Sequence, residues 1–119
     1  MLEYRYTIPR IPPSNNEYIG RTNRWEYQHD KKMWAALVKA HCRPAPEQPI
    51  AVGGVEIFYY FVDNRRRDPD NFSGKFLLDG LVKAGIIKDD SFGCIELTLK
   101  AAVDKENPRT EITVREAAT

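Results

Sequence analysis

The stretch that decides the fold runs Gly54-Val55-Glu56-Ile57-Phe58-Tyr59-Tyr60-Phe61-Val62. Both alternating sets of positions within it carry β-branched or aromatic side chains, with Gly54 and Glu56 as the exceptions. Successive side chains of a β-strand point to opposite faces, so a strand that is apolar on both faces is central in its sheet or lies at an interface. We therefore predict a central strand over residues 54–62.

Two further elements are predicted before this strand. Tyr4, Tyr6 and Ile8 alternate with polar residues, which indicates a first strand that Pro9 ends. Within residues 25–40, apolar side chains recur at intervals of three and four, as a helix that buries one stripe requires. The stripe consists of Met33, Ala36, Leu37 and Ala40, with Trp34 and Val38 beside it. Prolines 44, 46 and 49 end this helix.

A second helix is predicted over residues 71–84, with Gly85 just past its end and Lys75, Asp79 and Lys83 on its outer stripe. Residues 95–103 then alternate as in a half-buried strand, and Ile112 and Val114 mark its partner. Because only a short loop separates the two strands, we predict a hairpin. The order of elements predicts one α+β domain over residues 1–119, with two helices on a mixed or antiparallel sheet.

Composition limits the class of protein. The 119 residues, 42% hydrophobic and 29% charged, suit one folded domain. The sequence has no apolar run of the ~20 residues that span a bilayer and no signal-peptide pattern at its start, so we expect a cytoplasmic protein without a membrane partner. Cys42 and Cys94 lack the spacing of a zinc site.

Charge is distributed unevenly along the chain. The formal net charge is only +1, yet residues 5–43 hold eight basic and three acidic residues, and residues 64–88 hold six basic and three acidic. A surface that binds phosphate needs clustered positive charge rather than a high total. The distribution permits a nucleic-acid partner, and on charge alone solvated basic faces explain it equally well.

One short connection holds the most informative chemistry: Arg65-Arg66-Arg67-Asp68-Pro69-Asp70-Asn71. Cleavage of a phosphodiester with Mg²⁺ needs oxygen ligands for a hard cation and positive groups that hold the DNA backbone. This stretch supplies both, and Asp89 and Asp90 add carboxylates after the second helix.

A purely structural interpretation of the same stretch stays open. Asp68 would cap the second helix, Pro69 would be its first residue, and Asp70 would lie favourably in the helix dipole. Lys75 would then pair with Asp79, four residues on, although it would also lie over Asp68, seven residues back.

Several motifs together resemble the RusA family of Holliday-junction resolvases. They are the loop Pro12-Pro13-Ser14-Asn15-Asn16, the run from Arg65 to Asn71, a helix with Lys75 and Asp79, and Lys83-Ala84-Gly85 leading to Asp89-Asp90. The motifs occur in the family's order and nearly with its spacing.

The resemblance implies an endonuclease that cuts four-way DNA junctions in recombination and repair, acting as a homodimer with Mg²⁺. It assigns the metal to Asp68, Asp70 and Asp90, leaving Asp89 as an alternative to Asp90, and a catalytic role to Lys75. The residues expected to contact DNA are Asn15, Asn16, Arg65, Arg66, Arg67 and Asn71. Asp90 would share its site with Asp68 within one subunit or across the dimer, and we expect the former because residues after Phe92 can pair beside residues 55–62.

Two other functions remain open from the sequence. The first is a module of phage or prophage origin that binds branched DNA without cutting it, in which the aspartates only cap a helix. The second is a dimeric phage scaffold protein that touches DNA little, for which salt-dependent junction binding would be absent.

Overall fold

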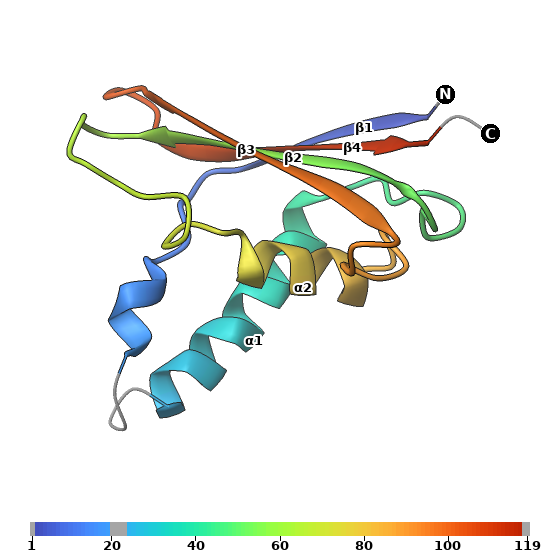
Figure 1. The fold of residues 1–119 in the computed structure, drawn as a ribbon, viewed down its shortest axis with the longest axis horizontal. Coiled ribbons are helices and arrows are strands. Elements are labelled where there is room, and N and C mark those ends of the chain that lie inside the picture. The colour runs from blue at the N-terminus through green and yellow to red at the C-terminus, as the bar shows by residue number, and fades with distance from the viewer. Residues whose placement is uncertain (1, 20–23, 118–119) are drawn as a thin grey trace.

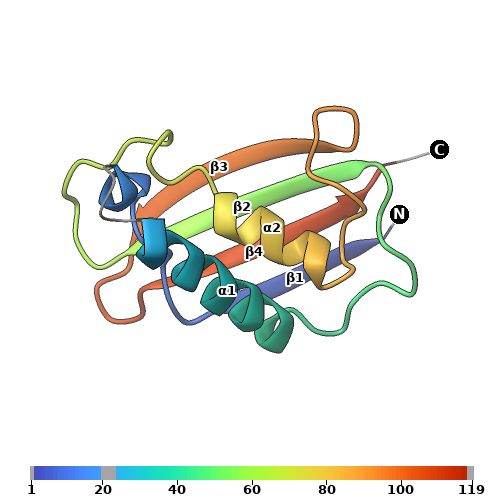
Figure 2. The ribbon, with the colours of Figure 1, turned by 90° about the horizontal axis from the view of Figure 1, so that it is seen from below.

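The central strand β2 (Gly53–Phe61) has a neighbouring strand on each side, as its two apolar faces predicted. In this computed structural model, which describes residues 2–19 and 24–117, the sheet order is β1-β4-β2-β3. The other strands are β1 (Glu3–Ile8), β3 (Ile95–Val103) and β4 (Arg109–Glu116). β4 runs antiparallel to both β1 and β2, whereas β3 runs parallel to β2, so the sheet is mixed (Figures 1 and 2).

The predicted hairpin between the last two strands is wrong, because β2 lies between β3 and β4. The chain leaves β3 through residues 104–108 and crosses the end of β2, where the Asp104 N–H donates to the Phe61 carbonyl at 2.8 Å. Two strand spacings amount to ~9.6 Å, which five residues span easily. A loop of this length therefore does not require β3 and β4 to be neighbours in the sheet.

Two helices cover one face of the sheet, α1 (Arg24–His41) and α2 (Lys75–Lys83), while the 3-10 helix η1 (Asn15–Tyr18) lies near the start of α1 (Figure 1). α1 and α2 pack closely at Gly80 of α2, where a Cβ would lie 2.7 Å from a methyl carbon of Val38 on α1. The buried stripe of α1 is rotated relative to the predicted one. Trp34 and Val38, which were predicted beside the stripe, are fully buried, whereas Ala36 and Ala40, which were predicted within it, are exposed.

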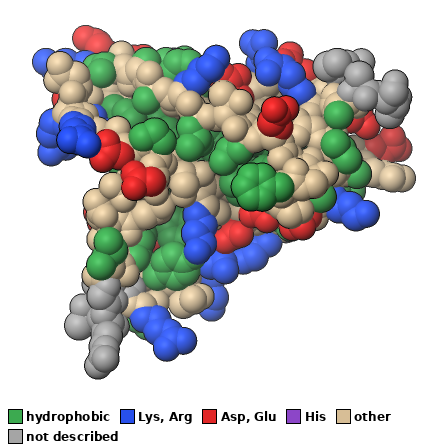
Figure 3. Space-filling view, in the orientation of Figure 1, with side chains coloured by type: hydrophobic (Ala, Val, Ile, Leu, Met, Phe, Trp, Pro, Cys, Tyr) green, Lys and Arg blue, Asp and Glu red, His purple; other side chains and the backbone are tan. Residues whose placement is uncertain are grey.

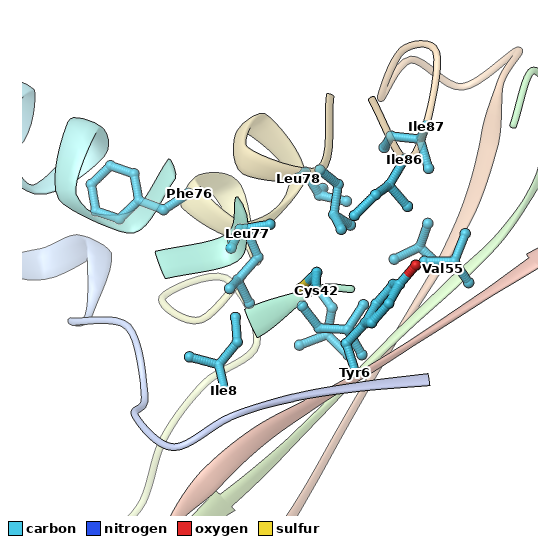
Figure 4. Close-up of a cluster of buried hydrophobic side chains, with 14 of the residues drawn as sticks. Tyr6, Ile8, Cys42, Val55, Phe76, Leu77, Leu78, Ile86 and Ile87 are labelled. Carbon is cyan, nitrogen blue, oxygen red and sulfur yellow. The ribbon is translucent and has the colours of Figure 1, made fainter. Parts of the chain in front are cut away.

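The core forms where these helices meet the sheet. Figure 4 shows part of it, with side chains from β1, β2, α2 and the segment after α2 gathered together. Its fully buried members include Ile8, Val55, Ile57, Ile112 and Val114 of the sheet and Trp34, Val38, Leu77 and Leu81 of the helices. Burial of such side chains contributes ~1.5–3 kcal/mol each, so this layer is the main source of stability.

The second helix begins later than predicted, at Lys75 rather than Asn71. Gly74 precedes it with φ 82°, a left-handed conformation that a helix cannot include. Residues 68–72 form a turn instead, in which the Asn71 N–H donates to the Asp68 carbonyl at 3.0 Å. Asp68 is therefore not a helix cap. Gly85, with φ 76°, ends the helix as expected.

Among the described residues, no helix is both long and apolar enough to cross a bilayer.

Candidate functional site

The charged stretch lies on the loop that joins β2 to α2, residues 62–74, at the end of the sheet where β2 finishes (Figures 1 and 2). The Asn15 N–H donates to the Asn71 carbonyl at 2.9 Å, so the start of η1 is tied to this loop. Figure 3 shows basic and acidic side chains together at this edge of the molecule. Two segments far apart in sequence thus form one surface.

Arg67 holds this loop together from inside. Its guanidinium donates to the Asp63 carboxylate at 2.8 Å and to the Asp63 and Arg65 carbonyls at 2.9 and 3.1 Å. It also stacks over the Phe61 ring, 4.1 Å from the ring centroid, and its side chain is only 16% exposed. These contacts occupy the guanidinium, so Arg67 shapes the loop.

Asp63, the ion-pair partner of Arg67, was not among the residues predicted from the sequence. Its carboxylate accepts from the Arg65 backbone N–H at 3.2 Å as well as from Arg67. The Arg65 N–H bond and the Arg67 guanidinium lower the pKa of Asp63 below its usual value. An aspartate two residues before an arginine N–H is the pattern of an Asx-turn, and that signal was available in the sequence.

Arg65 and Arg66 are the cations that face solvent. The Arg66 side chain is 88% exposed and its Nε donates to Asp68 Oδ1 at 3.2 Å. Arg65 makes a looser ion pair with Asp63 at 3.3 Å, and its side chain is also largely exposed. Exposed ion pairs of this kind contribute little to stability, ~0–1 kcal/mol, so both arginines are available to an external phosphate.

The two aspartates of the stretch lie on one tight turn. Asp70 is exposed and Asp68 half-buried. Asn15 holds the turn through its side-chain amide, which donates to the Asp70 carbonyl at 3.0 Å and to the Ser73 hydroxyl at 3.1 Å. Asn15 therefore positions the turn, whereas its neighbour Asn16 is exposed.

Most of the residues predicted from the sequence surround one open hollow of about 340 Å³. Its lining consists of Ser14, Asn16, Arg65, Arg66, Arg67, Asp68, Asn71 and Phe72. The fold thus brings the two predicted motifs, residues 12–16 and 65–71, to the same place. An open, shallow surface with basic and acidic groups suits a phosphate backbone and a hard cation better than a small apolar ligand.

Lys75 does not occupy the position that a continuous helix would have given it. Because residues 68–74 are not helical, Lys75 does not lie over Asp68 as expected. Its Nζ lies 5.3 Å from the centroid of the Tyr27 ring on α1, and a hydrogen bond to the Tyr27 hydroxyl raises its pKa. Asp79 forms its ion pair with Lys31 of α1 at 3.8 Å rather than with Lys75.

Asp90 lies at the opposite end of the sheet from Asp68. β3 pairs with β2 in parallel, with Ile95 opposite Gly53 and Val103 opposite Phe61. The segment before Ile95 is therefore beside the start of β2, whereas the Asp68 loop follows the end of β2. The expectation of pairing beside β2 is confirmed, but the inference that it carries Asp90 to Asp68 in the same subunit is wrong.

Across residues 2–19 and 24–117, no group of three or more acidic, histidine or cysteine side chains is placed to hold a metal ion. One chain supplies Asp68 and Asp70 at one end of the sheet and exposed Asp89 and Asp90 at the other.

The fold and the site define a small α+β domain with a mixed sheet and a loop of exposed arginines and aspartates at one end of it. The family model described as endodeoxyribonuclease RusA matches residues 9–115, most of the chain. The chain belongs to the RusA endodeoxyribonuclease family. Among curated proteins, none gives a significant match.

Proposed function

We propose that the protein is a Mg²⁺-dependent endonuclease that resolves four-way DNA junctions in recombination and repair. The observation that carries the proposal is the single hollow around which Asn16, Arg65, Arg66 and Asp68 lie, in a chain of the RusA endodeoxyribonuclease family.

The donor chemistry of the turn fits Mg²⁺ in part. Mg²⁺ is commonly held by one or two carboxylates together with water and substrate phosphate, and the Asp68 and Asp70 carboxylates are oxygen donors on one exposed turn. Asp90 is the third proposed ligand, and one chain does not bring it to this turn. When bound, Mg²⁺ would supply an activated water and stabilise the leaving oxygen.

The protein's own residues have distinct roles in this proposal. Arg65 and Arg66, with Asn16 and Asn71, bind the DNA backbone at the hollow, and Lys75 adds positive charge at the start of α2. Arg67 and Asn15 hold the loop in shape through the internal contacts described above. A four-way junction has two symmetry-related strands to cut, so a homodimer with a two-fold axis would present two equivalent sites.

Incubation with labelled four-way and linear duplex DNA, with and without Mg²⁺, tests this function. We expect nicks in the junction alone and only with the cation. Salt-sensitive binding of the junction without any nick would instead favour the non-cleaving binding module, and the lack of salt-sensitive binding would favour the scaffold protein.

A further inference from the structure

Trp25, in the first turn of α1, is an exposed tryptophan on a helix whose other tryptophan is buried. Trp25 is 73% exposed, whereas Trp34 lies fully buried in the core. A single exposed apolar side chain is common on protein surfaces, so exposure by itself does not indicate a site. The side chains around Trp25 are what distinguish it.

The Trp25 ring is held by His29, one helical turn further along α1. The two rings are stacked, with their centroids 5.1 Å apart and their planes inclined by 8°. Because Trp25 is nevertheless mostly exposed, the face of the indole that does not meet His29 is open to solvent. A side chain that is already oriented loses less conformational entropy when a ligand packs on it. The pair therefore forms a flat aromatic surface, the Trp25–His29 platform.

Unpaired positive charge flanks this platform. Arg24 directly precedes Trp25, Lys32 follows His29 by three residues, and both are exposed. Neither has an ion-pair partner within the part of the chain that the structure describes, whereas Lys31 pairs with Asp79 of α2 at 3.8 Å. Exposed cations beside an open aromatic face are the combination that binds a single nucleic-acid strand, through its phosphates and its bases.

The acidic residues of α1 lie on another side of the helix. Asp30 accepts a hydrogen bond from the Tyr18 hydroxyl of η1 at 2.6 Å, so this side faces η1. Glu26 lies one turn before Asp30 and therefore on the same side. Arg24 and Lys32 are a multiple of four residues apart and lie on the opposite side of Trp25 from Glu26. The charge beside the platform thus suits an anionic strand.

η1 links the platform to the hollow beside the β2–α2 loop. Asn15, at one end of η1, bonds to the Asn71 carbonyl of that loop. Tyr18, at the other end, bonds to Asp30, and its ring packs edge-on against Tyr27 of α1 with centroids 5.3 Å apart. In both ribbon views the start of α1 lies at the same end of the molecule as the loop (Figures 1 and 2). The hollow and the platform therefore belong to one end of the protein.

We infer that the Trp25–His29 platform stacks on an unpaired base of a DNA strand, while Arg24 and Lys32 contact the adjoining phosphates. Every base has a π-face, so such stacking tolerates any sequence. In a linear duplex the neighbouring base pairs cover these faces, so the platform favours a strand with an unpaired base. The use of this preference on branched DNA rests on the proposed function, whereas the stacking itself requires no nicking.

Intrinsic fluorescence tests the stacking, because the chain has two tryptophans and Trp34 is buried. Titration with single-stranded oligothymidylate should quench the emission of the unaltered protein, since a base would cover the indole of Trp25. The same strand paired with its complement should quench far less. Trp25→Phe leaves only Trp34 to emit and should show no quenching. Equal quenching by both DNAs, or quenching that persists in Trp25→Phe, would overturn the proposal.

The anisotropy of a labelled oligothymidylate separates stacking from charge. Trp25→Leu removes the ring and keeps an apolar side chain, so it should weaken binding about tenfold without changing the salt dependence. Lys32→Ala should instead make the slope of log K against log salt shallower by ~0.7, for one lost phosphate contact. Lys39→Ala, at an exposed lysine further along α1, is the matched control and should change neither property. Unaltered affinity of Trp25→Leu would overturn the proposal.

Thermal unfolding and light scattering distinguish the other roles of an exposed tryptophan. Trp25→Leu should melt with the unaltered protein, because the side chain lies outside the core. A loss of affinity that accompanies unfolding would give Trp25 a structural role, and a change in mass with unaltered affinity would make it a contact to another protein. Either result would overturn the proposal. Quenching without any nicking of junctions would support the stacking and overturn only the nuclease function.

Discussion

The side-chain amide of Asn15 donates a hydrogen bond to the backbone carbonyl of Asp70 at 3.0 Å, across 55 positions of sequence. A second bond from the same amide reaches the Ser73 hydroxyl at 3.1 Å. The turn that carries the two aspartates is therefore held by the first residue of η1.

Asn15→Ala should lower the free energy of unfolding by about 1 kcal/mol, because it removes both of these hydrogen bonds. Urea denaturation measures the change. Asn16→Ala, at an exposed neighbour, is the control and should leave the midpoint unchanged. Equal midpoints for both variants would show that the amide does not hold the turn.

Asp70→Asn should abolish nicking while the melting temperature and junction binding stay the same. The side chain is exposed, so the substitution removes a charge and little packing. Nicking of a labelled junction and thermal unfolding measure the two properties, with Glu47→Gln as a control for an unrelated exposed carboxylate. Wild-type turnover by the Asp70 variant would contradict its role as a metal ligand.

The double variant Arg65→Ala, Arg66→Ala should weaken junction binding regardless of sequence. The slope of log K against log salt should become shallower by ~0.9 for each phosphate that the variant no longer neutralises. Binding titrations over a range of salt concentrations measure the slope. An unchanged slope would indicate that DNA binds at α1, where Arg24, Lys31 and Lys32 lie. Arg21, another candidate, is outside the described residues.

Arg67→Ala should behave differently from its two neighbours and destabilise the fold by ~2 kcal/mol, because it removes a stacked, largely buried guanidinium and its bonds to Asp63. Chemical denaturation of the variant measures the loss of stability. Arg66→Ala is the matched control, with an expected change under ~0.5 kcal/mol.

Stability should fall in acid partly through Asp63. Its pKa is lowered in the folded protein, so its contribution is complete above the unfolded value of ~3.9 and is lost as the pH falls through the folded value. Unfolding measured between pH 7 and 2 should show a shallower acid decline for Asp63→Asn. Identical pH profiles would exclude this linkage.

Pattern alone predicted the elements well, because each periodicity reflects a local property. Apolar side chains on both faces of residues 54–62 marked a central strand, and the glycine at 85 marked a helix end, and both are confirmed. The pattern could not reveal which strands are neighbours, since a five-residue loop permits either a hairpin or a step across β2. It also missed that Gly74 delays the helix, because a glycine's backbone angle is not encoded in its type.

The site was predictable as a set of residue types but not as an arrangement. Residues 12–16 and 65–71 do meet at one hollow. The separation of Asp90 from Asp68 follows from the parallel register of β2 and β3, a long-range property that no local pattern contains. Likewise, three consecutive arginines look equivalent in the sequence, and only the fold distinguishes the internal Arg67 from its exposed neighbours.

The position of β4 determines when the sheet can form during synthesis. β4 follows every other element in sequence, yet it lies between β1 and β2 and joins them in the sheet. In a nascent chain that has emerged only to residue 108, β1 lacks β4, the strand with which it pairs. Folding must therefore wait for residues 109–116 to leave the ribosome, and such non-local pairing is slow.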